Sequence, residues 1–487
     1  MASAATGIRF VLDGQVVEAG EIAPATTVLQ YLREQLGRTG TKEGCAEGDC
    51  GACTVVLGEL DGERIDYRAI NSCIRFLPTI DGKELVSVES LQPKGASLHP
   101  VQQALVDCHA SQCGFCTPGF VMSLFALYLQ ASKPGPEAVV HALSGNLCRC
   151  TGYRPIVEAG CRMAEYPTPA HWSVKEPRSA ERVARLRSLQ REGTLAFPGF
   201  AAPRTLEEFA RLYEASPHSL IVAGATDVGL WVTKALKELP PMLYIGEVEE
   251  LRHATTQGAD IVIGAAVSLA DGYGEIVKHY PMLAELAERF ASPPVRHSGT
   301  LVGNVANGSP IGDSMPILIA LGAQVHLRRG NQSRSLEMED LYLAYRKTAM
   351  QPGEFIASVS VPLPVAGRFV ATYKVSKRID QDISAVCAAF AIEVRDGRVA
   401  AARIAFGGMG PIPQRARKAE AALVGAAWSR AGIGAAMAAL AEDFTPLSDM
   451  RASAAYRARV AANLLHRFHL EHSGTSTPLR VESLAVG

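Results

Sequence analysis

The sequence predicts a multidomain α+β protein, and three observations carry that prediction. A chain of 487 residues is too long for one hydrophobic core, which rarely grows past about 250 residues. Its charged fraction of 20% and hydrophobic fraction of 48% are typical of a globular protein. The hydrophobic period changes from strand-like to helical near Ser97, and strands and helices alternate after Phe209. We therefore expect domains at residues 1–88, 89–166, 196–366 and 367–487, with a linker at 167–195.

The charge balance and the apolar segments exclude several classes of protein. A net charge of −1 gives no electrostatic case for a nucleic acid or an anionic membrane as partner. No apolar stretch reaches the roughly 18 residues that a transmembrane helix needs, and the first residues lack the pattern of a signal peptide. Clustered cysteines without an export signal indicate metal or redox chemistry in a reducing compartment. We therefore expect a cytoplasmic protein with no nucleic-acid and no membrane partner.

The first domain is predicted to be a small sheet with one helix across it. Ile8–Leu12 and Gln15–Val17 flank an Asp-Gly pair, which is typical of a tight hairpin. A second such pair, Asp61-Gly62, follows the strand-like segment at 54–57. Between the hairpins, residues 27–36 carry apolar side chains at helical spacing. Two hairpins and one helix in so short a segment favour a β-grasp fold.

The second domain is predicted to be all-helical. Four segments have helical spacing, at 100–109, 118–131, 137–143 and 155–166. Thr117 is expected to cap the second helix, because Pro118 suits the first helical position. The prolines and charges that follow predict the linker, with one short helix near 180–191.

The last two domains are predicted to mix strands and helices. Strands are expected at 220–223, 261–263 and 323–327, separated by helices and glycine turns. A hairpin is expected at 385–394 and 398–406 around Asp396-Gly397, followed by alanine-rich helices to about residue 472. Both domains are therefore of the α+β class.

Four cysteines of the first domain have the spacing C-x4-C-x2-C with a fourth cysteine further on, which is the plant-type arrangement for a [2Fe–2S] cluster. They are Cys45, Cys50, Cys53 and Cys73. The glycines at 44, 48 and 51 let the loop curl so that its backbone N–H groups point at the sulfurs. The alternative is a structural zinc site with four cysteine ligands, which would make the chain a zinc-binding scaffold protein.

A second group consists of Cys113, Cys116, Cys148 and Cys150. Its spacing by itself fits zinc as well as an iron–sulfur cluster. The three remaining cysteines, at 108, 161 and 387, are expected to be small buried hydrophobes.

Two glycine-rich segments are candidates for a phosphate-containing cofactor. Residues 220–229 predict a strand, a glycine turn and an apolar helix, but Leu230 stands where a P-loop requires lysine. No G-x-G-x-x-G follows a strand, so a nicotinamide-binding Rossmann fold has no support. A turn with exposed N–H groups can still hold a pyrophosphate, although a plain packing turn is the alternative. Residues 300–313 add asparagine, serine and aspartate groups that can bond a diphosphate or a ribityl chain.

Two long motifs resemble the second iron–sulfur domain of the xanthine oxidase family of molybdenum hydroxylases. They are Gln112-Cys-Gly-Phe-Cys-Thr-Pro-Gly119 and Gly145-Asn-Leu-Cys-Arg-Cys-Thr-Gly-Tyr-Arg-Pro155. The resemblance extends over the whole chain except the linker. It implies, in order, a β-grasp [2Fe–2S] domain, a four-helix [2Fe–2S] domain, an FAD-binding domain and a flavoprotein C-terminal domain. It also implies that both cysteine groups hold [2Fe–2S] clusters and that Gln112 faces a molybdopterin.

The same resemblance implies an FAD site. Around the diphosphate it places Ile221, Val222, Ala223, Gly224, Ala225, Thr226, Asp227, Val228, Thr300, Leu301, Val302, Gly303 and Asn304, with Asp313 on a polar group and Phe290, Ile356 and Lys374 at further positions. Phe290 could stack on the flavin or serve as an ordinary core aromatic. Residues 373–383 resemble the segment that borders the flavin in members that use NAD, and a solvated charged loop is the alternative.

The family's molybdopterin-binding portion is missing from this sequence. The resemblance therefore implies the electron-transferring small subunit of a xanthine dehydrogenase, with no residue that catalyses the hydroxylation. Electrons would pass from molybdopterin on a large partner subunit through both clusters to FAD and then to NAD+, while hypoxanthine and xanthine are oxidised to urate. An α2β2 heterotetramer is the expected assembly. The same role in an aldehyde or N-heterocycle hydroxylase remains an alternative, as does the zinc-binding scaffold.

Overall fold

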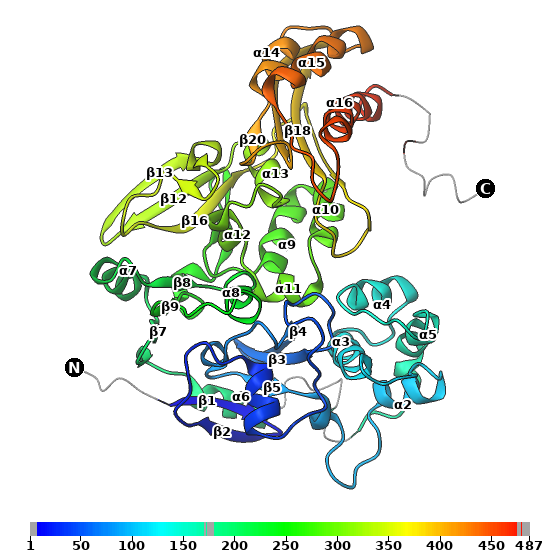
Figure 1. Ribbon diagram of the computed structural model, residues 1–487, viewed down its shortest axis with the longest axis vertical. Helices are drawn as coiled ribbons and strands as arrows, with labels where there is room; N and C mark the ends of the chain where they lie inside the picture. Colours follow the sequence, from blue (N-terminus) through cyan, green and yellow to red (C-terminus); the bar gives the residue numbers. More distant parts are fainter. Residues whose placement is uncertain (1–6, 170–171, 173–179, 475–478, 480–487) are drawn as a thin grey trace. The chain divides into compact units, whose positions relative to one another are not determined.

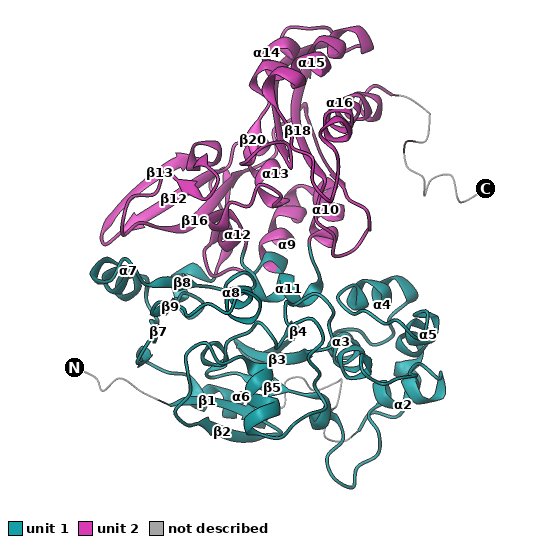
Figure 2. Cartoon of the chain, viewed as in Figure 1, with its two compact units in different colours: residues 1–252, 268–270, 291–300 teal, residues 253–267, 271–290, 301–487 magenta. Residues whose placement is uncertain are grey.

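The computed structural model describes residues 7–169, 172, 180–474 and 479, and the chain forms two compact units (Figure 2). Unit 1 comprises residues 1–252, 268–270 and 291–300, and unit 2 comprises residues 253–267, 271–290 and 301–487. Part of the predicted linker, at 170–171 and 173–179, lies outside the described residues.

Unit 1 begins with a five-stranded sheet of the order β2-β1-β5-β3-β4. Its strands are β1 (Ile8–Leu12), β2 (Gln15–Ala19), β3 (Thr54–Asp61), β4 (Arg64–Asn71) and β5 (Glu84–Val86). Both predicted hairpins are confirmed, and β1 pairs with β5 in parallel. The predicted helix consists of α1 (Val28–Gln30) and a π-helical continuation (Tyr31–Gln35). Its buried side chains share one core with β1, β3 and β5, as expected of a β-grasp fold.

The four predicted helices of the next domain are present. They are α2 (Pro100–Asp107), α3 (Thr117–Gln130), α4 (Pro136–Leu143) and α5 (Arg154–Arg162) (Figure 1). The prediction that Thr117 caps α3 is wrong. Cys116 occupies the N-cap position without a side-chain cap bond. Thr117 is the first residue of the helix, and its hydroxyl is hydrogen-bonded to that of Ser111 at 2.7 Å. The loop that carries two predicted metal ligands therefore runs directly into α3.

The short helix expected in the linker is α6 (Ala180–Leu189). Its side chains Val183, Leu186 and Leu189 are buried in the core that joins the β-grasp sheet to the helical domain. Directly after the helix, Arg191 forms an ion pair with Asp81 at 2.6 Å. The described part of the linker is therefore packed against the first domain.

A second sheet of unit 1 has the order β6-β7-β9-β8. It is formed by β6 (Leu195–Phe197), β7 (Phe200–Ala202), β8 (Leu220–Val222) and β9 (Met242–Tyr244), with helices α7 (Leu206–Ala215), α8 (Val228–Thr233) and α11 (Pro293–Ser298) in the same unit. The predicted sequence of strand, glycine turn and helix is thus observed as β8, the turn at 223–227 and α8.

Unit 2 contains an antiparallel sheet of the order β10-β11-β16-β12-β13. Its strands are β10 (Ala254–Gln257), β11 (Asp260–Gly264), β12 (Gln324–Arg329), β13 (Gln332–Glu337) and β16 (Phe355–Pro362), and a small pair is formed by β14 (Tyr342–Ala344) and β15 (Lys347–Thr348). The neighbouring helices are α9 (Leu269–His279), α10 (Ala284–Arg289), α12 (Leu301–Asn307) and α13 (Ser314–Leu321). All eight residues of α13 are buried, which explains its continuous apolar sequence.

The C-terminal part of unit 2 is a four-stranded sheet with three helices. The strands are β17 (Arg368–Val375), β18 (Val386–Arg395), β19 (Arg398–Gly407) and β20 (Gln414–Arg415), and the helices are α14 (Arg417–Leu423), α15 (Arg430–Asp443) and α16 (Ala454–Glu471). The core stacks Phe390 on Phe468 with ring centroids 5.1 Å apart. Across the described part of the chain, no helix has the length and apolar character needed to cross a membrane.

Candidate iron–sulfur and flavin sites

The loop that ends at β3 directs backbone N–H groups at the sulfur of Cys45. The amides of Glu47 and Cys50 lie 3.4 and 3.3 Å from this sulfur. Ala46 has a left-handed φ of 54°, which turns the chain back on itself. Hydrogen bonding from Cys50 and the surrounding amides lowers the pKa of Cys45 to about 5, although burial opposes ionisation. The loop is therefore arranged to hold a thiolate.

Cys53 and Cys73 lie side by side at the open end of the β3–β4 hairpin, where Thr54 pairs with Asn71. Their sulfurs are 3.2 Å apart, and the side chains are 1% and 2% exposed. The hydrogen bond between the two sulfurs lowers the pKa of Cys53 and raises that of Cys73. The amide of Asn71 adds a contact to the Cys53 sulfur at 3.8 Å. The first group thus consists of two sulfur pairs, Cys45 with Cys50 and Cys53 with Cys73.

The second group is also paired, but it is more exposed. Cys113 is hydrogen-bonded with Cys150, and Cys116 with Cys148. Cys113 and Cys150 are exposed, whereas the other pair is half-buried. Burial raises the pKa of Cys116 to about 12. The Thr151 hydroxyl donates to the Cys148 sulfur at 3.1 Å, and the pKa of Cys148 is lowered although burial opposes this.

The turn after Cys148 is held by Tyr153, whose φ of 68° is left-handed. Its hydroxyl accepts the backbone N–H of Cys148 at 3.0 Å, and its own N–H donates to Thr151 at 3.2 Å. Gln112, predicted to face a molybdopterin, is exposed and directly precedes Cys113.

The two cysteine loops are in contact within unit 1. The N–H of Leu147 donates to the carbonyl of Cys50 at 3.0 Å, and the Asn146 amide donates to the carbonyl of Gly51 at 3.2 Å. Leu147 directly precedes Cys148 in the chain. This hydrogen bond therefore links the backbone of a cysteine of the first group to the residue next to a cysteine of the second.

The donor chemistry fits [2Fe–2S] clusters. Each iron of such a cluster takes two of the four thiolates, and both groups present their cysteines as two pairs. Within the described residues, no three cysteine, histidine or acidic side chains converge as a single metal ion would need. All eleven cysteines of the chain are free. Of the three predicted to be buried hydrophobes, Cys387 is buried, but Cys108 and Cys161 are only half-buried.

The glycine turn predicted to hold a diphosphate lies against Ser298 and Gly299 in unit 1. A Cβ atom on Gly224 would lie 1.8 Å from the Ser298 carbonyl oxygen and 2.6 Å from the Cα of Gly299, so only glycine fits. Ala225 has a φ of 59°, and Thr300 forms a β-bridge with Ser268. Burial raises the pKa of Asp227. The structure therefore places Gly224 and Thr226 beside Gly299, which directly precedes the predicted residue Thr300.

The predicted FAD residues at 290, 301–304, 313, 356 and 374 belong to unit 2. The side-chain oxygen of Asn304 on α12 is buried without a hydrogen-bond partner, and it would suit a hydroxyl donor such as a ribityl group. Asp313 accepts hydrogen bonds from Lys374 and Ser384, each at 2.5 Å. The side chains of Asp313 and Lys374 are only 6% and 3% exposed, so they form a buried ion pair.

Two further predicted residues are packed in unit 2. Phe290 lies with its ring centroid 6.0 Å from that of Tyr273, and Ile356 is buried in β16 opposite Leu327. Sequence reasoning missed Thr151 and Ser384. Thr151 could have been found, because it directly follows Cys150, whereas nothing near Ser384 signals its bond to a residue 71 positions away.

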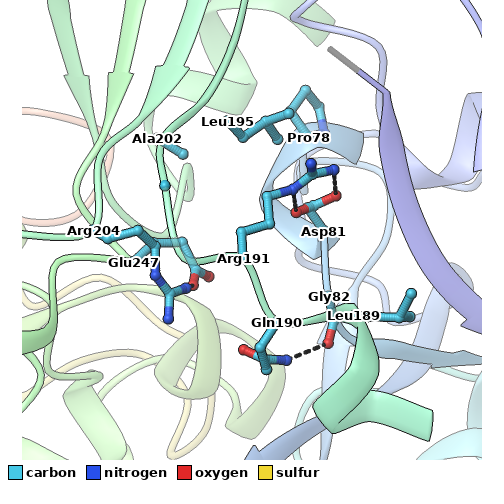
Figure 3. A pocket seen from close by; sticks show the side chains of 11 residues that line it. Pro78, Asp81, Gly82, Leu189, Gln190, Arg191, Leu195, Ala202, Arg204 and Glu247 are labelled. Atoms are coloured by element: carbon cyan, nitrogen blue, oxygen red, sulfur yellow. Dashed lines mark hydrogen bonds and ion pairs between the residues drawn. The ribbon is translucent and has the colours of Figure 1, made fainter. Parts of the chain in front are cut away.

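A small pocket lies between the end of α6, the turn at residues 78–82 and the sheet that contains β6 and β7 (Figure 3). Arg191 pairs with Asp81 on one side, and Arg204 pairs with Glu247 at 2.6 Å on the other. Its volume of about 20 Å³ leaves room for a single water molecule. The pocket is therefore too small for an organic substrate.

Four protein-family models match the chain in order. They describe a 2Fe-2S iron-sulfur cluster binding domain (residues 10–77), a [2Fe-2S] binding domain (87–161), an FAD binding domain in molybdopterin dehydrogenase (195–364) and a CO dehydrogenase flavoprotein C-terminal domain (371–472). The fold and these sites define an iron–sulfur flavoprotein that transfers electrons.

The curated proteins that are similar to this chain include xanthine dehydrogenases and an aldehyde oxidase. Xanthine dehydrogenase of Emericella nidulans is 31% identical over 95% of this chain and 38% of the relative. Xanthine dehydrogenase 1 of Arabidopsis thaliana is 31% identical over 83% of the chain and 35% of the relative. Aldehyde oxidase 4 of Cavia porcellus is 28% identical over 95% and 39%. The chain thus spans less than two fifths of the length of these relatives.

The solved structures that are similar to this chain are also oxidoreductases. Carbon monoxide dehydrogenase from Hydrogenophaga pseudoflava is 30% identical with a TM-score of 0.51, covering 55% of this chain and 94% of that chain. Quinoline 2-oxidoreductase from Pseudomonas putida 86 is 25% identical with a TM-score of 0.50 and the same coverage. The chain belongs to the xanthine oxidase family of molybdenum hydroxylases, and it is an oxidoreductase component with the family's [2Fe–2S] and FAD domains.

Proposed function

We propose that this chain is the electron-transferring small subunit of an NAD-dependent xanthine dehydrogenase. In this proposal the chain receives electrons from molybdopterin on a large partner subunit while hypoxanthine and xanthine are oxidised to urate. Its eight paired cysteines hold two [2Fe–2S] clusters, which supply one-electron transfer, and FAD supplies the hydride for NAD+. An α2β2 heterotetramer in the cytoplasm is the proposed assembly, with domain boundaries at 88, 166, 195 and 366.

The unequal exposure of the two cysteine groups supports the proposed order of electron transfer, from the partner to the second group and then to the first. Cys113 and Cys150 are exposed, whereas Cys53 and Cys73 are buried. A donor on another chain can approach the exposed cysteines of the second group more closely than the buried pair of the first. The hydrogen bond from Leu147 to the Cys50 carbonyl then leads inward from the second group to the first. Gln112, exposed beside Cys113, is the residue that we propose faces the pterin.

The FAD assignment has support in both units, each taken by itself. In unit 1 a Cβ atom at position 224 would clash with the backbone of Ser298, so the turn requires glycine there. In unit 2 the orphaned oxygen of Asn304 calls for a hydrogen-bond donor that no described residue supplies. Residues 221–228, Phe290, Thr300, 301–304, Asp313, Ile356 and Lys374 therefore remain the proposed FAD residues.

A second candidate function differs only in substrate. The similarity to an aldehyde oxidase and to a quinoline oxidoreductase supports an aldehyde or N-heterocycle hydroxylase, because the substrate pocket would lie on the partner chain. The electron route through this chain is the same in both proposals.

An anaerobic reduction experiment distinguishes these proposals. The chain is purified with its bound partner, xanthine is added without oxygen, and visible bleaching and NADH formation are followed. Bleaching together with NADH formation supports the proposal, and bleaching without NADH would remove NAD+ as acceptor. Bleaching by quinoline or an aldehyde but not by xanthine would refute the first proposal and support the second candidate function.

A matched variant tests the cysteine assignment. Cys148→Ser should remove one of two [2Fe–2S] signals in electron paramagnetic resonance and block bleaching by substrate, whereas Cys161→Ser should change neither. A purified chain with zinc in place of iron and no visible absorption would refute both functions and favour the zinc-binding scaffold.

A further inference from the structure

We propose that Thr233 and Lys234, at the end of α8, are positioning residues that hold the Cys45 loop and raise the reduction potential of its cluster. The inference rests on the proposed function, because it takes Cys45, Cys50, Cys53 and Cys73 as the ligands of a [2Fe–2S] cluster. It adds a role for two residues outside both cysteine motifs.

Peptide geometry explains why the loop needs donors on its outer side. The N–H of Glu47 points at the Cys45 sulfur. In a trans peptide the preceding carbonyl, that of Ala46, must then point the opposite way. A carbonyl directed away from the cluster site requires a donor once it is covered by protein. Thr233 supplies this donor, with its hydroxyl 2.6 Å from the Ala46 oxygen.

Lys234 supplies both a hydrogen bond and a positive charge. Its ammonium lies 2.8 Å from the carbonyl oxygen of Cys45 and 3.5 Å from the carboxylate of Glu47. Reduction adds one negative charge to a cluster, and a nearby cation stabilises that charge. The side chain is 47% exposed, so solvent screens the effect without removing it.

A second contact shows that α8 is fitted to this site. A Cβ atom on Gly229 would lie only 2.7 Å from the carbonyl oxygen of Ile74, the residue that follows Cys73. The helix therefore contacts the surroundings of both sulfur pairs, Cys45 through Lys234 and Cys73 through Gly229. It also begins directly after the turn proposed to hold the FAD diphosphate, so one short helix connects this turn with the site of the first cluster.

The test is a redox titration of the complete complex, monitored by electron paramagnetic resonance. The signal of the first cluster is identified as the one that persists in Cys148→Ser. Lys234→Met should lower the equilibrium constant for reduction of this cluster by about threefold to tenfold, where tenfold corresponds to 59 mV for one electron. Lys234→Arg keeps the charge and should restore the potential, and the second cluster should not change in either variant.

Lys237→Met is the matched control. Lys237 carries the same charge three positions further along, and its ammonium lies 5.9 Å from the ring centroid of Trp231. Its loss should leave the first potential unchanged. Thr233→Val keeps every charge but removes the bond to Ala46, and iron should leave the first site several-fold faster in the presence of a chelator.

The outcomes separate this inference from the proposed function. Equal potentials in Lys234→Met and in the unaltered chain, or equal shifts in Lys234→Met and Lys237→Met, would overturn the inference while both clusters are still observed. The absence of two [2Fe–2S] signals from the unaltered complex would overturn the proposed function, and the inference with it.

Discussion

Replacing Gly51 with alanine should separate the two cysteine loops. Gly51 has a φ of 71°, and a Cβ atom there would lie 2.2 Å from the carbonyl oxygen of Gly145 and 2.9 Å from the Cα of Asn146. Both neighbours are backbone atoms, so no side-chain rotation can relieve the clash. The loops must move apart, and the hydrogen bonds between them must lengthen or break.

The magnitude follows from three contributions. A left-handed conformation costs an alanine about 1–2 kcal/mol, and overpacking adds about 1–3 kcal/mol. The bonds from Asn146 to Gly51 and from Leu147 to Cys50 contribute about 0.5–1.5 kcal/mol each. We therefore expect Gly51→Ala to lower the free energy of unfolding of this part of the chain by about 3 to 8 kcal/mol.

Gly62→Ala separates the clash from the conformational strain. Gly62 has a φ of 59° in the β3–β4 hairpin, and nothing lies within 4 Å of the Cβ position. This variant should lose only about 1–2 kcal/mol. Urea unfolding followed by the visible absorbance of the clusters compares the two, and the magnetic coupling between the reduced clusters should weaken only in Gly51→Ala. Equal urea midpoints and unchanged coupling in both variants would refute the reasoning.

Three further predictions concern single side chains. Lys374→Met leaves the carboxylate of Asp313 buried and unpaired, so we expect a loss of about 3–5 kcal/mol in urea unfolding; a loss no smaller in the double variant that adds Asp313→Asn would contradict this. Thr151→Val removes the hydroxyl bond to the Cys148 sulfur and should lower the potential of the second cluster alone in a redox titration; a shift in the first cluster instead would count against the assignment. Burial would raise the pKa of Glu59, but neighbouring cations lower it to about 2, so its stabilisation is present above pH 5 and is lost as the pH falls toward 2. Because this carboxylate is 35% exposed, the loss should be only about 1–2 kcal/mol, and Glu59→Gln should abolish that part of the pH dependence of urea unfolding.

Local sequence patterns predicted most of the secondary structure. The Asp13-Gly14 and Asp61-Gly62 pairs marked two hairpins that the structure contains, because a tight turn is decided by the few residues that form it. Helical spacing predicted α2 to α5 for a similar reason. The cap of α3 was mispredicted, since Thr117 could bond either its own helix or Ser111, and only the folded loop decided between them.

The cysteine groups could be identified from spacing and motif, but their pairing could not. Spacing states which residues belong to one loop, and it leaves open which sulfurs face each other. The pairs Cys45 with Cys50 and Cys53 with Cys73 depend on how the loop folds against the β3–β4 hairpin. The exposure of Cys113 and Cys150 likewise depends on which faces of the helical domain are covered.

By itself, the sequence determined the succession of domains and the residue types that can hold iron, because turns, helical periods and ligand spacing are local properties. The tertiary structure decided the contacts that adjust those sites. Lys234 meets the carbonyl of Cys45 across 189 positions, and Asp313 meets Lys374 across 61. Such pairs form only after distant segments pack together, and no local pattern indicates which residues will meet. The physical reason is that packing, unlike a turn or a helical period, depends on the whole chain at once.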